Sequence, residues 1–380
     1  MELTEYELGQ LLIYEQPSAY IVKSTDYNDN YKIPVLTAGK SFILGYTNET
    51  EDVFDKLPVI IFDDFTTATQ YVNFKFKVKS SAMKILHINT ELVNPKYIYY
   101  RLQVIQFDHS THKRYWIQQY SKLKIQIPSL FEQERIVEKI EELFSDLDNA
   151  VETLKKAKEQ LGVYRQAVLE SCIGEGQICL IIDCVEEMGQ GWSPKCIRTP
   201  VLNDDEWAVI TTTAVQPLNF SFWENKKLPE NLGARPKHEL NIGDILITRA
   251  GPRSRCGVCC MVKKTKKKLM NCDKVYRIIV KRDMILPEYL EVVLNSPSFQ
   301  KEIAFCKTGG SDSGVNLTQD RFLNIKIPVP EIDIQNKILS NIASRISVCD
   351  SIEKTVDIAL SQAEAMRQSI LKQAFEGRLI

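Results

Sequence analysis

The sequence predicts an α+β protein in which two globular mixed α/β modules are separated by a pair of long antiparallel coiled-coil helices, with an internal pseudo-twofold duplication. Three observations support this fold class. One stretch repeats its apolar residues with the period of a coiled coil, and the same pattern returns 202 residues further on. Each copy follows a long segment of short strand-like runs that glycine and proline interrupt.

The first repeat extends from Lys124 to Cys172. A strand-like run, Lys124–Ile127, meets Pro128, and a helical pattern follows in which apolar residues alternate at spacings of four and three. Such heptad spacing requires a partner helix rather than a broad globular face. The predicted seam consists of Ile136, Ile140, Leu143, Leu147, Leu154 and Leu161 in this helix and Ile338, Ile342, Ile352, Val356, Met366 and Ile370 in its copy.

The copy of the helix supplies the partner. Adding 202 to each number turns Pro128 into Pro330 and Gln133 into Gln335, and the alignment needs no gap across the whole repeat. A repeated supersecondary unit of this kind indicates duplication. The predicted organisation is a first module at residues 1–123, a first long helix at 124–172, a second module at 173–325 and a second long helix at 326–380.

The connectivity favours an antiparallel pair. A helix of this length spans about 63 Å at 1.5 Å per residue. The second module joins the end of the first helix to the start of the second, so parallel helices would force that module to bridge nearly the whole length. In an antiparallel pair the two ends meet, and we expect the modules at opposite ends of the coil.

Composition bounds the class of protein. The chain has 380 residues, 44% of them hydrophobic, and a formal net charge of −1. No apolar run approaches the ~18–20 residues of a membrane span, and the N-terminal residues lack the apolar core of a signal peptide. All ten cysteines lie between Cys172 and Cys349, a distribution that favours reduced thiols. We therefore expect a cytoplasmic protein with no membrane association.

Local basic segments provide the candidate nucleic-acid contacts. Tyr71–Val78 is a predicted strand, in which lysines would share one face with Lys79 and alternate with apolar residues. Residues 235–282 contain fourteen basic and three acidic side chains. A solvated basic surface would look the same. The candidates are Lys40, Thr66, Thr67, Lys75, Lys77, Lys79, Lys84, Lys226, Lys227, Arg249, Arg253, Arg255, Lys263, Lys264, Lys266, Lys267, Lys268 and Lys274.

Two roles are predicted within the second basic segment. Arg249, Arg253 and Arg255 follow a predicted strand in a loop with glycine and proline, where the guanidinium fork would suit the O6 and N7 acceptors of guanine. The lysines at 263–268 would form a hairpin tip and contact phosphates, whose counterions they would release.

Catalytic and metal motifs are weak. NPKY at 94–97 superficially resembles an amino-methyltransferase signature, but its duplicate, LPEY at 286–289, makes a repeated helix start the better interpretation. Cys256 and Cys259 have a metal-ligand spacing without a second pair, and they lie in an apolar run that favours buried thiols over zinc. We predict no catalytic and no metal site in this chain.

The order of module, helix, module and helix resembles the specificity (S) subunit of Type I restriction–modification enzymes. The motifs that carry the resemblance are IPSLFEQERIVEKI at 127–140, VPEIDIQNKILSNI at 329–342 and MRQSILKQAFEGRL at 366–379. The resemblance covers the whole chain. It implies a non-catalytic, DNA-binding subunit of a restriction system in which each module is a target-recognition domain for one half of a bipartite asymmetric target.

The resemblance also implies partners. The helices would set the half-site spacing and dock two methyltransferase (M) subunits, and restriction (R) subunits would join the complex on double-stranded DNA. S-adenosylmethionine, ATP and Mg would be bound by those partners, which methylate adenine and cleave DNA, and no cofactor by this chain. Two other functions remain open from the residues alone: a coiled-coil scaffold without sequence-specific DNA binding, and a nuclease or methyltransferase that acts alone.

Overall fold

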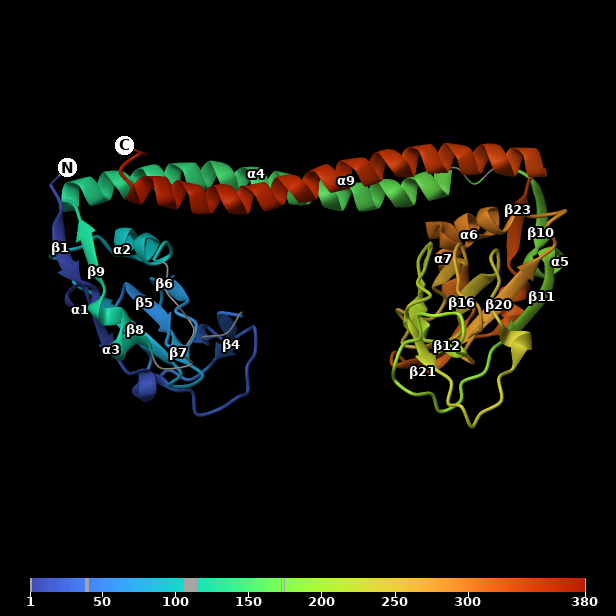
Figure 1. The fold of residues 1–380 in the computed structure, drawn as a ribbon, viewed down its shortest axis with the longest axis horizontal. Coiled ribbons are helices and arrows are strands. Elements are labelled where there is room, and N and C mark those ends of the chain that lie inside the picture. The colour runs from blue at the N-terminus through green and yellow to red at the C-terminus, as the bar shows by residue number, and fades with distance from the viewer. Residues whose placement is uncertain (1, 38–40, 106–114, 172, 174, 380) are drawn as a thin grey trace. The chain divides into compact units, whose positions relative to one another are not determined.

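The computed structural model describes residues 2–37, 41–105, 115–171, 173 and 175–379, and Figure 1 shows its fold. The chain divides into two compact units. Unit 1 comprises Met1–Lys155 with Asp357–Ile380, and unit 2 comprises Lys156–Val356. Two long helices contribute to both units: α4 has 42 residues, Leu130–Ser171, and α9 has 44 residues, Ile332–Phe375. The predicted class, mixed α/β modules with two long helices, is confirmed.

Unit 1 is built on a four-stranded antiparallel sheet with the order β2-β8-β5-β6. A second sheet, β4-β3-β7, combines an antiparallel and a parallel pair, and β1 pairs with β9 next to α4. The strands are β1 (Thr4–Glu7), β2 (Leu12–Glu15), β3 (Ile33–Leu36), β4 (Ile43–Thr47), β5 (Val59–Asp63), β6 (Thr69–Val72), β7 (Lys77–Val78), β8 (Met83–Ile88) and β9 (Lys124–Ile127). The helices are α1 (Leu8–Leu11), η1 (Pro17–Tyr20), α2 (Pro95–Leu102), α3 (Tyr115–Gln118) and η2 (Tyr120–Lys122).

Unit 2 repeats this plan. Its sheets β11-β20-β16-β18 and β15-β12-β19 have the same pairing directions as their counterparts, and β10 pairs with β23 as β1 pairs with β9. The strands are β10 (Gln177–Leu180), β11 (Val185–Gln190), β12 (Ala208–Ile210), β15 (Asn225–Lys227), β16 (Ile245–Thr248), β18 (Cys259–Met261), β19 (Leu269–Met270), β20 (Val275–Val280) and β23 (Lys326–Val329). The helices are α5 (Ile181–Cys184), η3 (Thr212–Ala214), η4 (Pro236–His238), α6 (Pro287–Asn295) and α8 (Gln319–Leu323).

Unit 2 contains a hairpin and a small sheet in addition to these elements. A hairpin joins β13 (Val215–Gln216) to β14 (Asn219–Phe220), and a small sheet has the order β17-β22-β21. Its strands are β17 (Ala250–Gly251), β21 (Lys307–Ser311) and β22 (Gly314–Leu317), and the helix α7 (Pro297–Phe305) comes just before β21 in the chain. Both modules therefore share the same sheets and strand pairs, and they differ in the insertions between these elements.

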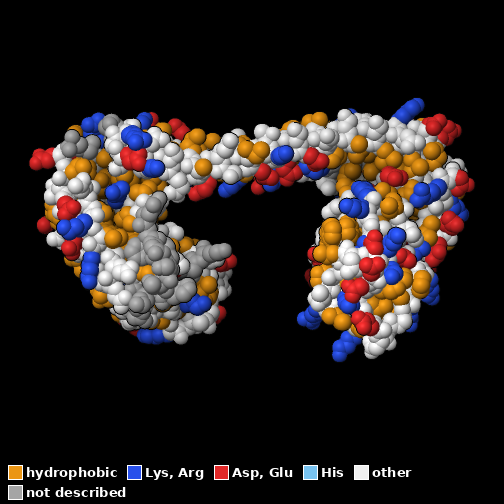
Figure 2. All heavy atoms as spheres, in the orientation of Figure 1, with side chains coloured by type: hydrophobic (Ala, Val, Ile, Leu, Met, Phe, Trp, Pro, Cys, Tyr) orange, Lys and Arg blue, Asp and Glu red, His pale blue; other side chains and the backbone are white. Residues whose placement is uncertain are grey.

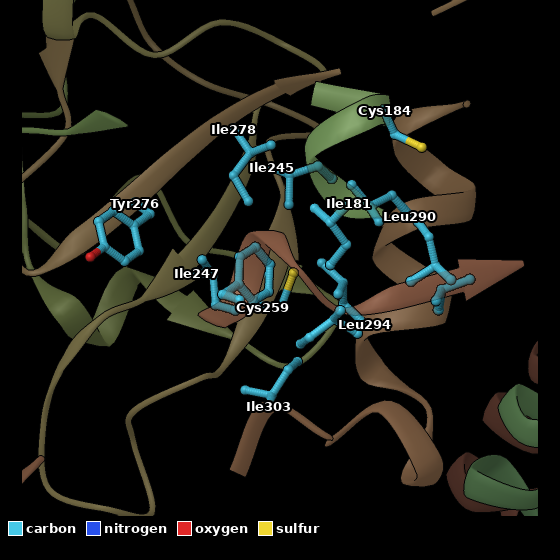
Figure 3. Close-up of a cluster of buried hydrophobic side chains, with 14 of the residues drawn as sticks. Ile181, Cys184, Ile245, Ile247, Cys259, Tyr276, Ile278, Leu290, Leu294 and Ile303 are labelled. Atoms are coloured by element: carbon cyan, nitrogen blue, oxygen red, sulfur yellow. The ribbon is translucent and has the colours of Figure 1, made fainter. Parts of the chain in front are cut away.

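Each unit has its own core. In unit 1 the short helix α2 packs its Tyr97 and Ile98 against Ile136 and Ile140 of α4, in a cluster that α9 joins through Leu371. In unit 2 the largest cluster lies between the four-stranded sheet and α6, with Ile245, Ile278 and Leu290 among its fully buried members (Figure 3). Burial of these apolar side chains is the main favourable contribution to each unit's stability.

The long helices pair antiparallel within each unit. In unit 1 the Arg367 guanidinium of α9 contacts the Asp148 carboxylate of α4 and stacks on Phe144, 4.2 Å from the ring centre. In unit 2 the Arg165 guanidinium of α4 lies 2.8 Å from the Asp350 carboxylate of α9. The two ion pairs are related by the 202-residue offset, with the roles of the helices exchanged, as in the isologous contacts of a twofold-symmetric pair.

The predicted seam residues differ in burial. Ile136, Ile140, Ile342, Val356 and Ile370 are buried. Leu143, Leu147, Leu154, Leu161 and Ile338 are half-buried. Ile352 and Met366 are 45% and 54% exposed, so the prediction that they lie in the buried seam is corrected. A helix with one partner leaves the flank of its apolar stripe open to solvent. Val137, Phe144, Leu169 and Leu371 are buried outside the predicted seam, where α4 and α9 also pack on a module.

Among the described residues, no helix combines the length and apolarity needed to cross a membrane.

Candidate nucleic-acid interface

The basic segment of the second module is spread over several strands and faces many acidic neighbours. In Figure 2 the visible surface of unit 2 shows Lys and Arg side chains interspersed with Asp and Glu rather than a field of one sign. The contacts of each predicted cation therefore decide which ones can meet a phosphate or a base.

Arg255 is held by its own unit. Its guanidinium donates to the Thr212 carbonyl at 2.9 Å, to the Val215 carbonyl at 2.7 Å and to Gln216 Oε1 at 3.0 Å. These bonds use the guanidinium N–H groups that a guanine base would need. They also connect the Arg255 loop to η3 and to the β13–β14 hairpin. The interpretation of Arg255 as a base reader is corrected: its side chain has a structural role.

Two of the predicted phosphate-contacting lysines are bonded to a neighbouring loop of unit 2. Lys266 is 5% exposed, its ammonium donates to the Glu206 carbonyl at 3.0 Å, and burial lowers the pKa of this amine. The Lys268 ammonium donates to the Asp205 carbonyl at 2.7 Å, from a backbone with φ of 58°. Both lysines fold back on the loop at 204–206, which corrects the prediction of an open hairpin tip for these two residues.

Other predicted cations remain accessible but have partners. Arg253 is paired with Asp312 at 2.7 Å, and its side chain is 50% exposed. The Lys263 ammonium lies 2.9 Å from the buried carboxylate of Glu291. The Arg249 Nε donates to the Asp273 carbonyl at 2.7 Å. Lys264 lies over the Phe222 ring at 5.7 Å, Lys227 contacts Glu206, and Lys226, Lys267 and Lys274 are exposed.

Unit 2 brings four cations together in one pocket of about 520 Å³, which we call the basic pocket. Its basic lining residues are Lys195, Arg198, Lys226 and Lys274. Thr211 and Thr212 also line the pocket, and Asp273 is the acidic lining residue. A concave surface with several cations can hold the phosphates of a nucleic-acid backbone.

Close backbone packing positions this pocket. The Gly191 amide donates to the Cys272 carbonyl at 3.0 Å, and a Cβ at Gly191 would lie only 2.1 Å from the Asn271 carbonyl oxygen. The Ser193 hydroxyl then contacts the Asp273 carboxylate. A bridge between Ile197 and Lys227 of β15 holds the other end of the loop. The loop thus presents Lys195 and Arg198 beside Lys226.

Lys195 and Arg198 were not among the contacts predicted from the sequence. They lie outside the densely basic segment, and the residues that their loop contacts, Asn271, Cys272 and Asp273, are far along the chain. The available signal was a loop with Gly191 and Pro194 followed at once by two cations in the run KCIR.

Unit 1 places its predicted contacts differently. Tyr71–Val78 is not one strand: β6 ends at Val72 and β7 begins at Lys77. Lys77 is fully buried, its ammonium 3.0 Å from the Glu49 carboxylate, and Lys84 is buried beside Asp64 at 3.8 Å. Both ammonium groups are enclosed by unit 1 and cannot reach a phosphate, which corrects their interpretation as phosphate contacts.

The remaining predicted contacts of unit 1 lie on its surface. Lys75 is exposed and 3.7 Å from Asp55, and Lys79 is exposed. Thr66 donates its hydroxyl to Asp63, and Thr67 has a φ of 58° in the turn between β5 and β6. Lys40 lies outside the described residues. A role for these residues in DNA contact stays a prediction.

The two thiols with metal-ligand spacing, Cys256 and Cys259, are buried in the core of unit 2. Cys256 and Cys259 are 2% and 0% exposed, and burial raises the pKa of both thiols. Among the described residues, no group of three or more His, Cys, Asp or Glu side chains could hold a metal ion.

Comparisons with known proteins agree with the duplication. The family model of the Type I restriction modification DNA specificity domain matches residues 2–161 and again residues 201–362. The chain is 31% identical to the Type I restriction enzyme EcoR124I/EcoR124II specificity subunit of Escherichia coli, over 97% of this chain and 93% of that protein.

Two solved structures share the fold. A chain from a study of complex assembly and conformational transition of the type I R-M system has a TM-score of 0.68 at 14% identity, covering 99% of this chain and 98% of that one. The HsdS subunit from Thermoanaerobacter tengcongensis has a TM-score of 0.51 at 14% identity, with coverage of 99% and 97%. At such identities these likenesses concern the fold alone.

Two repeated α/β modules, each joined to a long helix, define a protein with two equivalent domains. The matched family specifies what is recognised. The chain belongs to the family of Type I restriction modification DNA specificity domains, as a specificity subunit with two target recognition domains.

Proposed function

We propose that each module reads one half of a bipartite asymmetric DNA target and that the paired helices set the distance between the halves. The observation that carries this proposal is the duplication, in which the same sheets and the same long helix recur in both units. The region where each module meets its long helix, which we call the joint, contains the β1–β9 pair and α2 in unit 1 and the β10–β23 pair and α6 in unit 2. A protein with two equivalent reading domains suits a target with two parts. Dimeric readers bind half-sites about 34–36 Å or multiples apart, and a 42-residue helix spans about 63 Å.

In the second module the basic pocket would hold the DNA backbone. Lys195, Arg198, Lys226 and Lys274 outnumber the one acidic lining residue, Asp273, so the pocket carries a net positive charge that attracts phosphates. Phosphate contacts fix the register of a protein on DNA and leave base reading to neighbouring side chains. Arg249 and Arg253 follow the end of strand β16 in the chain, and they are the base-reading residues that we propose for this module.

The chain would act within a complex. The E. coli relative is named as a specificity subunit of a Type I restriction enzyme. We infer that this chain likewise binds methyltransferase subunits, two per specificity subunit, and restriction subunits, in the cytoplasm. Those partners would bind S-adenosylmethionine, ATP and Mg and carry out adenine methylation and cleavage, while this chain would contribute recognition without catalysis.

Sequencing of methylated bases in the source cell tests the proposal. We expect one adenine-methylated motif with two specified halves and an unspecified spacer, which disappears when this chain is deleted and returns when it is supplied again. A methylation pattern that deletion leaves unchanged would refute the proposed function, and so would a dependent motif without two halves.

A further inference from the structure

A buried glutamine ties the first turn of α4 to the module in unit 1. Gln133 is 0% exposed. Its Oε1 accepts the Asn94 backbone N–H at 2.7 Å, and its Nε2 donates to the Pro128 carbonyl at 2.9 Å and to the Leu92 carbonyl at 3.3 Å. Asn94 is the N-cap of α2. One side chain therefore connects the start of the long helix to the start of the module helix that packs on it.

The same arrangement recurs in unit 2. Gln335 is also 0% exposed, and its Oε1 accepts the N–H of Leu286, the N-cap of α6, at 2.8 Å. Its Nε2 donates to the Pro330 carbonyl at 2.7 Å and to the Met284 carbonyl at 2.9 Å. We call these two sets of bonds the glutamine clamps. The modules differ in many loops, yet both clamps use the same three backbone positions.

The clamps supply what apolar packing does not. The contacts of α2 with α4 are largely apolar, and hydrophobic attraction has no preferred direction, so it tolerates small rotations and slides. A fully satisfied buried amide fixes one orientation, because rotation of the module would leave its donors unpaired. Lys96 and the Tyr100 hydroxyl also contact the Glu141 carboxylate in unit 1, and this link has no counterpart in unit 2, since positions 288, 292 and 343 hold Glu, Val and Ala.

We propose that Gln133 and Gln335 are positioning residues that fix the angle of each module on its long helix and thereby make recognition selective for one spacer length. This inference rests on the proposed function, because spacer length has a meaning only for a bipartite target. The clamps touch neither the basic pocket nor the predicted base-reading arginines. Loosening them changes where each reading surface is held, while the base contacts within a half-site stay the same.

The test uses the full chain co-expressed with its methyltransferase subunits. Plasmids carry the two half-sites at the native spacer and at spacers one base pair shorter and longer. For the double variant Gln133→Leu with Gln335→Leu, the ratio of native-spacer to altered-spacer methylation is expected to fall roughly tenfold, the effect of losing a few buried hydrogen bonds. The half-site sequences are expected to stay unchanged. A general loss of stability would lower methylation at all spacers in proportion and leave this ratio unaltered.

Two further sets of variants make the result decisive. Gln133→Glu with Gln335→Glu keeps the side-chain size and the accepted bond but sets a carboxylate oxygen against the two carbonyl oxygens that each amide nitrogen held, and a fall in the ratio at least as large is expected. Gln160→Leu and Gln362→Leu alter exposed positions on the same helices and should leave the ratio at the wild-type value.

An unchanged ratio in both clamp variants, with a bipartite wild-type motif, would overturn the clamp proposal alone. A leucine variant that no longer assembles would overturn it too, since the clamps would then hold the modules in place rather than set their angle. A wild-type chain without any bipartite motif would instead refute the proposed function.

Discussion

Units 1 and 2 share their joints and differ in their charged surfaces. Thr4 lies opposite Ile127 in one unit as Gln177 lies opposite Val329 in the other, and the glutamine clamps repeat bond for bond. The lysines follow no such rule. Unit 1 buries Lys77 and Lys84, whereas unit 2 gathers four cations in the basic pocket.

This difference separates two demands on the sequence. Where a module meets its long helix, the backbone register and the buried polar groups must fit the same helix in both units, so Gln133 and Gln335 recur at the 202-residue offset and bond the same backbone positions. Where a module faces outward, a loop can change length or charge without disturbing the joint. Divergence on one surface and repetition at the other is what two readers of unlike half-sites would require.

The largest expected effect concerns the two leucines related by the duplication. Leu371→Ala in unit 1 and Leu169→Ala in unit 2 each remove a fully buried side chain, at a cost of about 2–5 kcal/mol. Leu371 lies in the larger cluster, so its replacement should cost more. Hydrogen–deuterium exchange resolved by peptide measures both units separately, with Leu130→Ala, at an exposed position, as control. Equal losses of stability in the two units would contradict the expectation that Leu371→Ala costs more than Leu169→Ala.

Two arginines of one loop sharpen the distinction between structural and reading residues. Arg255→Ala should destabilise unit 2 by about 1.5–3 kcal/mol, because a charged side chain gives up three hydrogen bonds. Arg253→Ala should cost less than about 1 kcal/mol, since its ion pair is exposed. Urea unfolding gives both values. A severe loss for Arg253→Ala with none for Arg255→Ala would reverse the assignment.

The basic pocket predicts unequal salt dependence between the modules. Lys226→Ala and Lys274→Ala should each weaken binding to all sequences alike and lower the slope of log binding constant against log salt by about 1. Lys337→Ala is the control, because Lys337 is exposed on α9 and lies outside the candidate contacts. The measurement is a salt titration with target and unrelated duplexes. Unchanged slopes in the pocket variants would remove the pocket from the interface.

The smallest expected effect is a pH dependence in unit 1. Burial favours the protonated acid of Glu49, but hydrogen bonds from the Ser24 amide, the Lys77 ammonium and the Lys23 amide outweigh it and hold its pKa below the ordinary value of 4.5. A carboxyl whose folded pKa is depressed stabilises the fold above its unfolded pKa and loses that contribution as pH falls through the folded pKa. Glu49→Gln should therefore destabilise unit 1 at neutral pH and not at strongly acidic pH.

Thermal unfolding at a series of pH values measures this difference. Glu51→Gln, at a side chain that is 86% exposed, is the control and should behave as wild type throughout. A Glu49→Gln penalty that persists in strong acid would mean that the carboxylate charge is not its source.

The long helices and the duplication could be predicted from the sequence because both are periodic signals, visible in Gln133 and Gln335 or in Arg165 and Arg367 without any knowledge of packing. The surface charges could not. Whether Lys266 faces solvent depends on the Glu206 carbonyl far along the chain, and Lys195 joins Lys274 only through the turn that Gly191 contacts. Composition locates cations along the sequence, while tertiary neighbours decide which ones remain available.

The most direct test of the central claim, one half-site for each module, is an exchange of residues 1–123 for the equivalent module of a relative with a different target. The exchanged chain is expressed with its methyltransferase subunits, and the methylated motif is sequenced. The account predicts that one half of the motif changes to that of the relative, while the other half and the spacer length stay as they were. A change in both halves, or in neither, would contradict it.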